Sequence, residues 1–507
     1  MPGGFIRFEQ VIFAYDSMTE PLLRDFDVTF PAGWTGIVGP NGAGKTTVLR
    51  LACGLLEPLR GHVRSPGDAV LCEQRTDEMP QNFAAFMADD GDACELKGRL
   101  GIQEDWLERW DSLSHGERKR AQIATALWRR PEILALDEPT NHMDAAARDL
   151  LIGTLRTFRG MGLLVSHDRE LLDTLCDQCL FIDPPDVILR PGNYSEGRRE
   201  SEREEETALR QREKARQQFE QLQAEAHKRA QKAQQADRRR SKRGLAKGDS
   251  DGRARIDLAR VTGMDGRAGV LAERMNSRVD RARKQLSDSK VKKRYESGIW
   301  VEGERCRRDT LFRLLAGTLP LGESRSLSFP DLSMRPDDRI ALTGANGAGK
   351  STLLEAIHET AIRAGASLPE ERVVWLPQEI MRRDSTGILE EARRQPRETL
   401  GTLLTVVRRL GSDPARLLES VEPSPGELRK LLLALGISRH PWLIVMDEPT
   451  NHLDLPSVEC LEDALRECNC GLLLVSHDEL FLKELTRTRW HITQTKDGDS
   501  HLSVEIR

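Results

Sequence analysis

The chain has 507 residues and a net charge of −5, and 31% of its residues are charged. This length exceeds what one hydrophobic core can organise, so we expect at least two domains. No run approaches the roughly 18 uninterrupted apolar residues that a membrane-spanning helix needs. The first residues also lack the apolar run of a signal peptide, so we expect a cytoplasmic protein without a membrane partner.

The first part of the chain alternates between strand-like and helix-like segments. Edge strands are predicted over 5–13 and 28–30, and a helix over 45–56. Buried parallel strands are predicted for three short apolar runs, 36–38, 133–136 and 162–165. This order indicates an α/β domain.

A glycine-rich loop lies between the first buried strand and the predicted helix. Residues 39–47 fit the phosphate-binding pattern Gly-x-x-x-x-Gly-Lys-Ser/Thr. The glycines let backbone N–H groups turn inward around phosphates, Lys45 would reach the β- and γ-phosphate oxygens, and the Thr46 hydroxyl would hold Mg²⁺. An ordinary glycine turn is the alternative, and a second copy of the pattern argues against it.

Four further motifs follow this loop in the first half. They are Gln74 in a short loop, a Ser-x-Gly-Glu turn at Ser114, a Leu-Asp-Glu-Pro-Thr-Asn-His run that contains Asp137, and a Val-Ser-His-Asp run around His167. Asp137 ends a buried apolar strand, where an unpaired carboxylate is costly unless it coordinates Mg²⁺. Glu138 is placed to polarise an attacking water, and His167 could contact the terminal phosphate.

A segment of different composition joins the two halves. No Gly or Pro occurs between Arg198 and Arg243, so one long helix of roughly 70 Å is predicted over 196–243. A second helix is predicted over 269–293, after a break at 244–252. Both helices have apolar residues at helical spacing: Ala208, Ala215, Phe219, Leu222 and Ala226 in the first, and Val270, Leu271, Met275, Val279, Ala282 and Leu286 in the second. A helical hairpin is predicted, with a solvated linker helix as the alternative.

This joining segment is strongly basic. Residues 196–294 contain 29 Lys and Arg against 17 Asp and Glu, a net charge of +12 in an acidic chain. Its densest basic cluster surrounds the break, and a cluster without aromatic residues favours phosphates and folded RNA over stacked single-stranded bases. A solvated charged surface is the alternative. The predicted RNA-binding residues are Arg238, Arg239, Arg240, Lys242, Arg243, Lys247, Arg253 and Arg255.

The second half repeats the motif series from about 326 to 478. Its phosphate loop, 344–352, is displaced by 305 residues and its glutamine, Gln378, by 304. The Ser-x-Gly-Glu turn at Ser424, the aspartate Asp447 and the histidine His477 are all displaced by 310 residues. A tandem repeat of a whole series predicts two copies of one domain type and two nucleotide sites.

Both motif series resemble those of the ATP-binding-cassette superfamily. The resemblance implies head-to-tail packing of two cassettes around two ATP molecules, with Ser114 and Ser424 in signature motifs that complete the opposite site. The implied catalytic residues are Glu138, Glu448, His167 and His477, and the implied Mg²⁺ ligands are Thr46, Gln74, Asp137, Ser351, Gln378 and Asp447. The implied nucleotide-binding residues are Tyr15, Gly39, Asn41, Gly42, Gly44, Lys45, Thr46, Thr47, Gln74, Ser114, Gly116, Glu117, Gly344, Asn346, Gly347, Gly349, Lys350, Ser351, Thr352, Gln378, Ser424, Gly426 and Glu427.

The two copies differ at two positions. Pro423 replaces the usual leucine of the second signature, which is expected to alter the start of the helix. Tyr15, 24 residues before Gly39, suits stacking on adenine, whereas the same offset in the second half gives Pro320. The second site is therefore expected to bind adenine more weakly or through other groups.

Two cassettes joined by a basic helical linker resemble the F subfamily, and so do Asn-His-Met-Asp at 141–144 and Asn-His-Leu-Asp at 451–454. The resemblance implies an ATPase that acts on the ribosome, through ribosomal RNA or P-site tRNA. Closure of the cassettes would insert the linker near the tRNA exit site and the peptidyl-transferase centre, to modulate translation or protect it from antibiotics. It implies a monomer that does not bind DNA.

Several alternatives remain at the level of sequence. A housekeeping translation or ribosome-assembly factor is the nearest, although the linker of about 100 residues and the short 45–114 segment favour the resistance type. A transporter ATPase would need a membrane partner. A coiled-coil DNA-repair ATPase would have one cassette split by hundreds of residues, and an iron–sulfur recycling factor would have cysteines before Gly39.

The predicted fold is therefore α/β, with two P-loop ATP-binding-cassette domains joined by a long α-helical hairpin. The predicted boundaries are 1–195 for the first cassette, 196–294 for the linker and 295–507 for the second cassette.

Overall fold

The computed structural model describes residues 4–240, 266–288 and 306–506, apart from short gaps at 90, 142, 323–324, 364–367, 379, 381, 413, 420–422, 452 and 496–497. The chain divides into two compact units, one of Met1–Gly197 with Ser297–Arg507 and one of Arg198–Glu296. Within the described ranges, no helix combines the length and the apolar character that crossing a membrane requires. We call the part before the linker the first half and the part after it the second half.

The first half contains a six-stranded sheet in the order β5-β6-β7-β3-β8-β9, parallel except for β9. A three-stranded antiparallel sheet, β2-β1-β4, accompanies it. Strands β6 and β7 are buried along their whole length, as their uninterrupted apolar sequences predict. The strands are β1 Ile6–Phe13, β2 Leu23–Phe30, β3 Gly33–Val38, β4 Arg60–Arg64, β5 Ala69–Cys72, β6 Ile133–Asp137, β7 Met161–Val165, β8 Gln178–Asp183 and β9 Asp186–Pro191.

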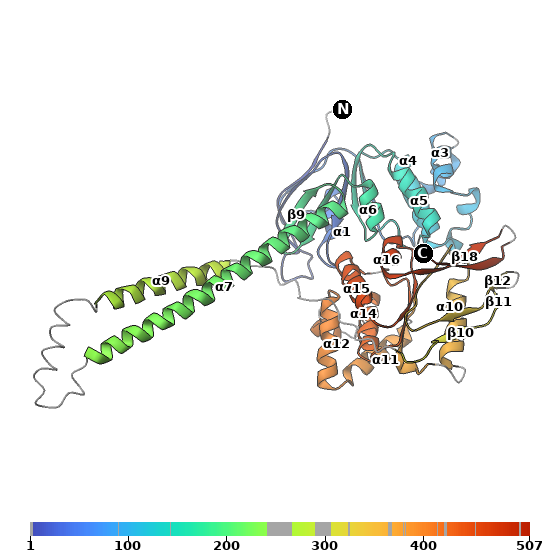
Figure 1. Ribbon diagram of the computed structural model, residues 1–507. Coiled ribbons are helices and arrows are strands. Elements are labelled where there is room, and N and C mark those ends of the chain that lie inside the picture. Colours follow the sequence, from blue (N-terminus) through green and yellow to red (C-terminus); the bar gives the residue numbers. More distant parts are fainter. Residues whose placement is uncertain are drawn as a thin grey trace, which may run out of the picture. The chain divides into compact units, whose positions relative to one another are not determined.

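Helices surround this sheet (Figure 1). They are α1 Lys45–Ala52, α2 Phe83–Ala88, α3 Asp92–Leu100, α4 His115–Trp128, α5 Ala145–Leu155 and α6 Arg169–Leu175, with 3₁₀ turns at Glu104–Trp106 and Trp110–Ser112. Helix α1 ends four residues before the predicted 45–56. The cause is Gly54, whose φ of 69° is left-handed, so that the Leu55 N–H turns back to the Arg50 carbonyl at 2.9 Å and closes the helix.

Strand β2 is also longer than the predicted 28–30. It begins at Leu23, because the alternating burial of Leu23, Phe26 and Val28 continues the antiparallel ladder with β1. Phe26 stacks edge-on against Phe8 of β1, with ring centroids 5.1 Å apart. A polar interruption at 24–25 hides this alternation from a search for apolar runs.

The second half repeats the topology of the first. The six strands β15-β16-β17-β14-β18-β19 match β5-β6-β7-β3-β8-β9 in order and direction, and β12 and β11 extend the sheet to eight strands. The strands are β10 Phe312–Leu314, β11 Gly317–Pro320, β12 Ser326–Phe329, β13 Leu332–Met334, β14 Arg339–Gly344, β15 Val373–Leu376, β16 Leu443–Asp447, β17 Gly471–Val475, β18 Thr488–Gln494 and β19 Ser500–Ile506.

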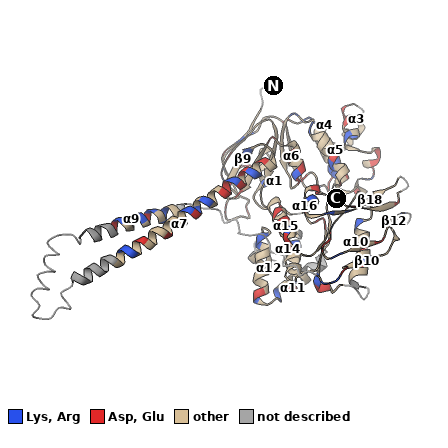
Figure 2. Ribbon diagram, viewed as in Figure 1, with Lys and Arg blue, Asp and Glu red and all other residues tan. Residues whose placement is uncertain are grey.

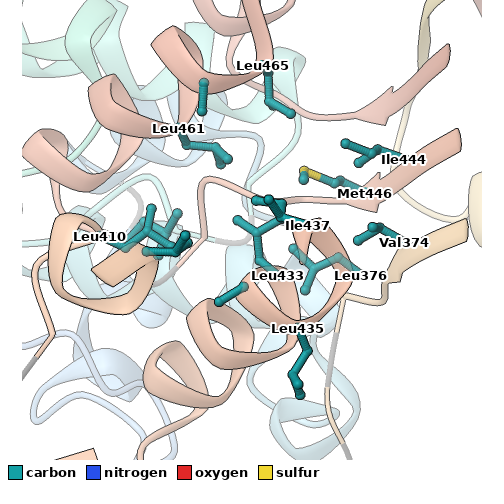
Figure 3. Packing of buried hydrophobic residues seen from close by; sticks show 14 of the residues in the cluster. Val374, Leu376, Leu410, Leu433, Leu435, Ile437, Ile444, Met446, Leu461 and Leu465 are labelled. Carbon is teal, nitrogen blue, oxygen red and sulfur yellow. The ribbon is translucent and has the colours of Figure 1, made fainter. Parts of the chain in front are cut away.

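The helices of the second half are α10 Lys350–His358, α11 Arg382–Arg393, α12 Arg397–Arg409, α13 Pro414–Glu419, α14 Pro425–Ile437, α15 Leu455–Glu467 and α16 Glu479–Leu485, with a π-helical turn at Glu359–Arg363 and a 3₁₀ turn at Glu370–Arg372. One large apolar core lies between these helices and the sheet (Figure 3). In it Val374 and Met446 from the strands pack with Leu433 and Ile437 from α14. Burying each such side chain stabilises the fold by about 1.5–3 kcal/mol, and this core fixes α14 and its first residues against the sheet.

The second unit is a pair of helices, α7 Tyr194–Arg240 and α9 Gly266–Asp288, which lie side by side (Figure 1). Among the described residues of the second unit, Ala215, Met275, Val279 and Ala282 are buried, and all four belong to the two predicted apolar stripes. The Arg283 guanidinium of α9 lies over the Phe219 ring of α7, 5.8 Å from its centroid. The predicted hairpin is therefore confirmed for its two helices, and the predicted break at 244–252 lies outside the described residues.

Basic and acidic residues are interleaved along both helices (Figure 2). Several pair at one-turn spacing, as Arg216 does with Glu220 at 3.0 Å. Of the predicted RNA-binding residues, Arg238, Arg239 and Arg240 end α7 with side chains outside the described set, and Lys242, Arg243, Lys247, Arg253 and Arg255 lie outside the described residues altogether.

Candidate functional site: two nucleotide sites built from repeated strand ends

The predicted site residues follow three neighbouring strands in each half. Strand β3 runs into the first phosphate loop, β6 ends at Asp137, and β7 is followed by His167. Because β6, β7 and β3 are adjacent and parallel, their carboxyl ends meet at one edge of the sheet. Strands β14, β16 and β17 bring the second loop, Asp447 and His477 together in the same way.

Each phosphate loop folds around its own lysine. Lys45 Nζ donates to the Gly39 carbonyl at 2.8 Å and to the Pro40 carbonyl at 3.1 Å. Lys350 Nζ makes the same contacts with residues 344 and 345 at the same two distances. Burial lowers the pKa of both lysines, which the nearby carboxylates oppose.

Both loops end in a left-handed glycine that begins a helix. Gly44 precedes α1 with φ 93°, and Gly349 precedes α10 with φ 104°. A side chain at either position would be strained, and it would also touch leucines of the strands that cross above the loop. The backbone N–H groups at these helix starts form a site that suits an anion.

A hydroxyl and a carboxylate face each other behind each loop. Thr46 Oγ1 donates to Asp137 Oδ2 at 2.7 Å, and Ser351 Oγ donates to Asp447 Oδ2 at 3.4 Å. Burial raises the pKa of both aspartates. The predicted glutamines, Gln74 and Gln378, lie in exposed loops after β5 and β15.

A buried cation donates to the backbone carbonyl of each of these aspartates, and the sequence did not reveal these two residues. Lys119 Nζ donates to the Asp137 carbonyl at 3.1 Å and to the Glu73 carbonyl, and Arg429 Nη2 donates to the Asp447 carbonyl at 2.7 Å. Both cations are buried. Lys119 and Arg429 each lie five positions after a signature serine, and so they are 310 residues apart. This repeated position is the signal that could have identified them.

The glutamates that follow the aspartates have strained backbones. Glu138 has φ 47° and Glu448 has φ 48°, a left-handed conformation that non-glycine residues rarely adopt outside functional sites. The backbone N–H of His167 donates to Glu138 Oε2 at 3.2 Å, and that of His477 donates to Glu448 Oε2 at 3.3 Å. Each glutamate is thereby held beside the histidine of its own half.

Burial sets the protonation of these glutamate–histidine pairs. It raises the pKa of Glu138 and of Glu448 to about 8, and lowers the pKa of His167 to about 3 and of His477 to about 4. His167 Nε2 lies 3.1 Å from Glu138 Oε1 without the geometry of a hydrogen bond. The two carboxyl groups therefore keep their protons to a higher pH than a free glutamate, and the two imidazoles stay uncharged to a lower pH than a free histidine.

Both signature turns start a helix with the same cap. Ser114 accepts from the Glu117 backbone N–H at 3.3 Å, while the Glu117 carboxylate accepts from the Ser114 backbone N–H at 2.8 Å. Ser424 and Glu427 repeat this capping box at 3.3 and 2.9 Å. The expected effect of Pro423 is therefore absent: Ser424 has φ −63° and ψ 154°, against −65° and 157° for Ser114.

A cavity of about 630 Å³ combines residues from both halves. From the second half it is lined by Lys350, Ser351, Thr352, Gln378, Asp447, Glu448 and His477. From the first half it receives Ser114, His115, Asn141 and Arg148. The structure thus brings Ser114 to the second phosphate loop, while Gly116 is buried in the first turn of α4.

Each half also reaches the phosphate loop of the other through an aspartate. Asp454 Oδ2 accepts from the Asn41 backbone N–H at 2.8 Å, and Asp144 Oδ2 accepts from the Asn346 backbone N–H at 3.5 Å. Asp454 and Asp144 cap α15 and α5, so a helix start from each half is tied to the opposite loop. Ser424 and Gly426 lie at the start of α14 in the half that supplies Asp454.

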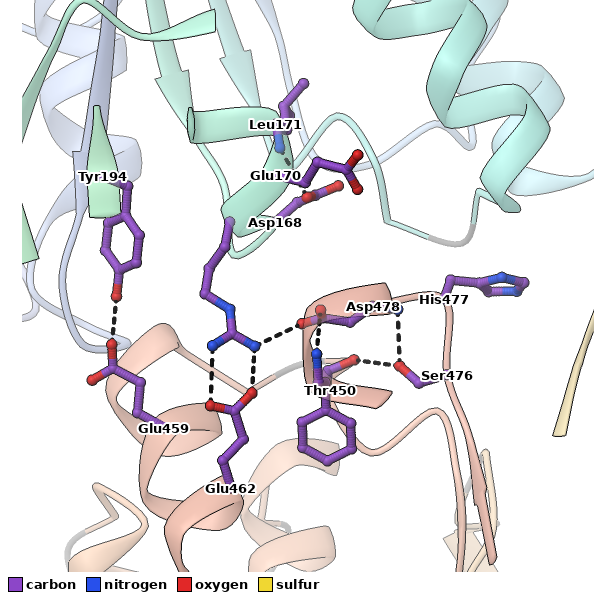
Figure 4. Close-up of polar contacts among 12 residues, drawn as sticks. Asp168, Glu170, Leu171, Tyr194, Thr450, Glu459, Glu462, Ser476, His477 and Asp478 are labelled. Carbon is purple, nitrogen blue, oxygen red and sulfur yellow. Dashed lines mark hydrogen bonds and ion pairs between the residues drawn. The ribbon is translucent and has the colours of Figure 1, made fainter. Parts of the chain in front are cut away.

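An asymmetric set of ion pairs also joins the halves. Arg169 of α6 makes a bidentate pair with Glu462 of α15 and a second pair with Asp478 at 3.2 Å. Close by, Tyr194 Oη donates to Glu459 Oε1 at 2.8 Å (Figure 4). The repeat could not predict these pairs, because the residue 310 positions after Arg169 is an acid, Glu479.

Arg148 is a further asymmetric contact that the sequence did not reveal. It is buried on α5, and its Nη1 donates to the His477 carbonyl at 3.3 Å. It also pairs with Glu170 and with Asp168. The residue 310 positions later is Val458, so His167 receives no matching contact from that position.

Comparison with known proteins places both halves in one family. The family described as "ABC transporter" matches residues 23–141 and 327–451. Ribosome protection protein VmlR of Bacillus subtilis (strain 168) is 30% identical over 469 residues, covering 90% of this chain and 80% of the relative. Erythromycin resistance ATP-binding protein MsrA of Staphylococcus epidermidis is 27% identical over 473 residues, covering 90% and 91%. Energy-dependent translational throttle protein EttA of Haemophilus influenzae is 25% identical over 530 residues, covering 92% and 88%.

A solved structure supports the fold. The archaeal ribosome recycling factor aABCE1, in a crystal structure with the ribosomal stalk protein aP1, matches 97% of this chain and 89% of its own with a TM-score of 0.63. The two sequences are 18% identical, so this likeness concerns the fold alone.

Proposed function

This chain belongs to the F subfamily of ATP-binding-cassette proteins, and we propose that it acts on the ribosome from the cytoplasm. It is an ATPase with two ATP-binding-cassette domains. The proposed boundaries are 1–195 and 295–507 for the cassettes and 196–294 for the linker. ATP-driven closure of the cassettes inserts the linker near the tRNA exit site and the peptidyl-transferase centre, and hydrolysis releases it.

The observation that carries the ATP part of the proposal is the cavity shared by the two halves. Lys350 would bind the outer phosphates after leaving its loop carbonyls, and Ser114 of the opposite cassette would contact the same nucleotide. The first site is proposed to combine Lys45 with Ser424 and Gly426 in the same way. Cassette closure is coupled to both sites because each loop touches an aspartate of the other half.

The proposed Mg²⁺ ligands suit that ion. The Thr46 hydroxyl and Asp137 carboxylate, and the Ser351 hydroxyl and Asp447 carboxylate, are hard oxygen donors that already face each other. Gln74 and Gln378 lie in loops that could add an amide oxygen. Mg²⁺ bound there would neutralise phosphate charge.

Glu138 and Glu448 are proposed to orient and polarise the attacking water. Their Oε1 atoms are buried without a hydrogen-bond partner among the described residues, and a water would satisfy them. Glu448, His477 and His167 line the cavity that contains the second phosphate loop. His167 and His477 are proposed to contact the terminal phosphate of the nucleotide in their own half.

The charge of the linker supports the ribosomal RNA as its partner. Residues 196–294 carry a net charge of +12, whereas the whole chain carries −5. Such a segment binds a phosphate backbone by releasing counterions. We propose that Arg238, Arg239, Arg240, Lys242, Arg243, Lys247, Arg253 and Arg255 contact ribosomal RNA or P-site tRNA, and that the protein acts as a monomer.

Two roles fit this activity, and the antibiotic-protection role is favoured. VmlR and MsrA carry protection and resistance in their names, and VmlR is 30% identical to this chain. EttA, a translational throttle protein, favours the second candidate, a housekeeping translation factor. Expression of the chain in a susceptible strain distinguishes them, because only the first role raises the inhibitory concentration of a ribosome-targeting drug.

A hydrolysis-blocked variant tests the proposal. The Glu138→Gln/Glu448→Gln double variant should pellet with ribosomes through a sucrose cushion in ATP, and much less in ADP. The Lys45→Ala/Lys350→Ala variant is the matched control and should not pellet, since ATP cannot close its cassettes. Pelleting of the glutamine variant no better than wild type would contradict the proposed cycle.

A further inference from the structure

The second nucleotide site lacks an aromatic residue at the position of Tyr15, but residues around the turn between β11 and β12 form a surface at that place. In the first half, Tyr15 lies in the turn between β1 and β2, and its hydroxyl is 3.1 Å from Thr47 Oγ1 of the phosphate loop. Its ring packs edge-on against Phe13 at 4.9 Å. This turn therefore places an aromatic face directly beside the phosphate site.

The corresponding turn of the second half lies over the second phosphate loop. A Cβ on Gly44 would touch Leu22 and Leu23 at 3.3 Å, at the start of β2. A Cβ on Gly349 would touch Leu321, directly after β11, at 2.9 Å and Leu327, at the start of β12, at 3.2 Å. The strand-turn-strand therefore crosses above the same glycine in both halves.

The second turn is much shorter than the first. Residues 14–22 separate β1 from β2, whereas only 321–325 separate β11 from β12. The Leu321 N–H donates to the Arg325 carbonyl at 2.8 Å and closes the short turn. The extra residues that carry Tyr15 in the first half thus have no counterpart in the second.

The end of β11 and the described residues of the short turn nevertheless line the shared cavity. Pro320, Leu321, Gly322 and Arg325 border the same space as Lys350 and Thr352. Thr352 is the counterpart of Thr47, which contacts Tyr15 in the first half. The cavity therefore extends from the second phosphate loop toward the place that corresponds to Tyr15. A nucleotide whose phosphates lie at Lys350 would place its base against this turn.

Arg325 is held in position at this end of the cavity. Its side-chain stem lies against the turn between β18 and β19, where a Cβ on Gly498 would come within 3.3 Å of its Cδ. The next residue, Ser326, donates from its backbone N–H to Asp499 Oδ1 of the same turn at 2.8 Å. The backbone and the aliphatic stem of Arg325 are thus held in place, while the side chain as a whole remains exposed to solvent.

We propose that Arg325 is the nucleobase-binding residue of the second site, with its guanidinium plane stacked on the base and with Pro320 and Leu321 as the aliphatic surface beside it. A planar, delocalised cation stacks on an aromatic ring and replaces the tyrosine by a cation–π contact. The inference rests on the proposed function, because it assumes that Lys350 binds the phosphates of ATP.

The test measures nucleotide binding at the second site of the full chain. In the Lys45→Ala background, which removes the first site, ATP–Mg²⁺ binding is measured by isothermal titration with and without Arg325→Ala. Arg325→Ala should weaken ATP binding about 5-fold, the size of a partly exposed cation–π contact. It should leave the binding of inorganic triphosphate, which has no base, unchanged.

Two exchanges separate stacking from simple charge. Arg325→Tyr should restore ATP binding to within about 2-fold of the Lys45→Ala parent, because an aromatic ring stacks on the base as well. Arg325→Lys should restore less, because an ammonium lacks the plane. Equal losses for ATP and triphosphate, rescue by lysine but not tyrosine, or no loss with Arg325→Ala would each overturn the proposal. If the Lys45→Ala parent itself fails to bind ATP, the proposed second site fails with it, an outcome visible before Arg325 is changed.

Discussion

The ion pair between Arg169 and Glu462 yields the sharpest prediction about how the halves are held together. Both side chains are largely buried, with 13% and 7% of their surface exposed, and Arg169 also pairs with Asp478. Replacing Arg169 by methionine leaves Glu462 buried without its bidentate partner. Removing one member of a buried pair costs about 3 kcal/mol, because the remaining charge must be desolvated alone or take up a proton.

The assay is thermal unfolding of a double-mutant cycle at pH 7. For domains of this size, about 3 kcal/mol corresponds to a fall in Tm of roughly 6–12 °C for Arg169→Met. Arg169→Met/Glu462→Met should return to within about 3 °C of wild type, since an apolar pair of similar volume replaces the ions. The exposed pair of Arg394 with Glu390, 78% and 60% exposed, supplies the control, and Arg394→Met should shift Tm by less than about 2 °C. Equal shifts for Arg169→Met and Arg394→Met would show that burial does not strengthen the pair of Arg169 with Glu462.

Three further predictions concern the sites. Burial raises the pKa of Glu138 and Glu448 to about 8, so their protonated forms stabilise the nucleotide-free fold at pH 5, and this stability is lost as pH rises through 8. In urea titrations from pH 5 to above pH 8, the Glu138→Gln/Glu448→Gln variant should lose less stability than wild type. Equal losses would contradict the direction of the pKa shift. Pro423→Leu should leave Tm and the ATPase rate within about 2 °C and 2-fold of wild type, because the capping box already has its ordinary geometry, and a large gain in rate would show that the proline matters. Lys119→Met should lower the free energy of unfolding by about 1–3 kcal/mol in urea titrations, because it leaves buried carbonyls without a donor. The control, Arg129→Met, removes an exposed cation and should change this free energy little. Equally small effects of the two variants would show that the buried cation is not needed.

Local signals allowed the sequence to predict the phosphate loops and the buried strands. Each of these depends on residues within about ten positions of one another, and the repeat at 310 residues supplied an internal check. The predicted end of α1 was wrong because Gly54 closes the helix through its backbone conformation, which the apolar pattern does not encode.

Contacts between the halves were not predictable in the same way. Arg148, Arg169 and Glu462 have no chemically similar partner at the repeat offset, so comparing the two copies gave no reason to single them out. Their roles depend on which helices face each other, and packing of distant segments decides that. The same holds for Arg325, whose importance follows from the shortened turn between β11 and β12 and not from a motif.

In the proposed cycle, ATP-closed cassettes hold the basic hairpin on the ribosome. This arrangement can be observed by cryo-electron microscopy of the Glu138→Gln/Glu448→Gln variant with ribosomes and ATP. We expect density for two nucleotides between the cassettes and for α7 and α9 reaching from the tRNA exit site toward the peptidyl-transferase centre, with residues 238–255 against RNA. A complex with the hairpin directed away from RNA, or with no ribosome bound at all, would contradict it.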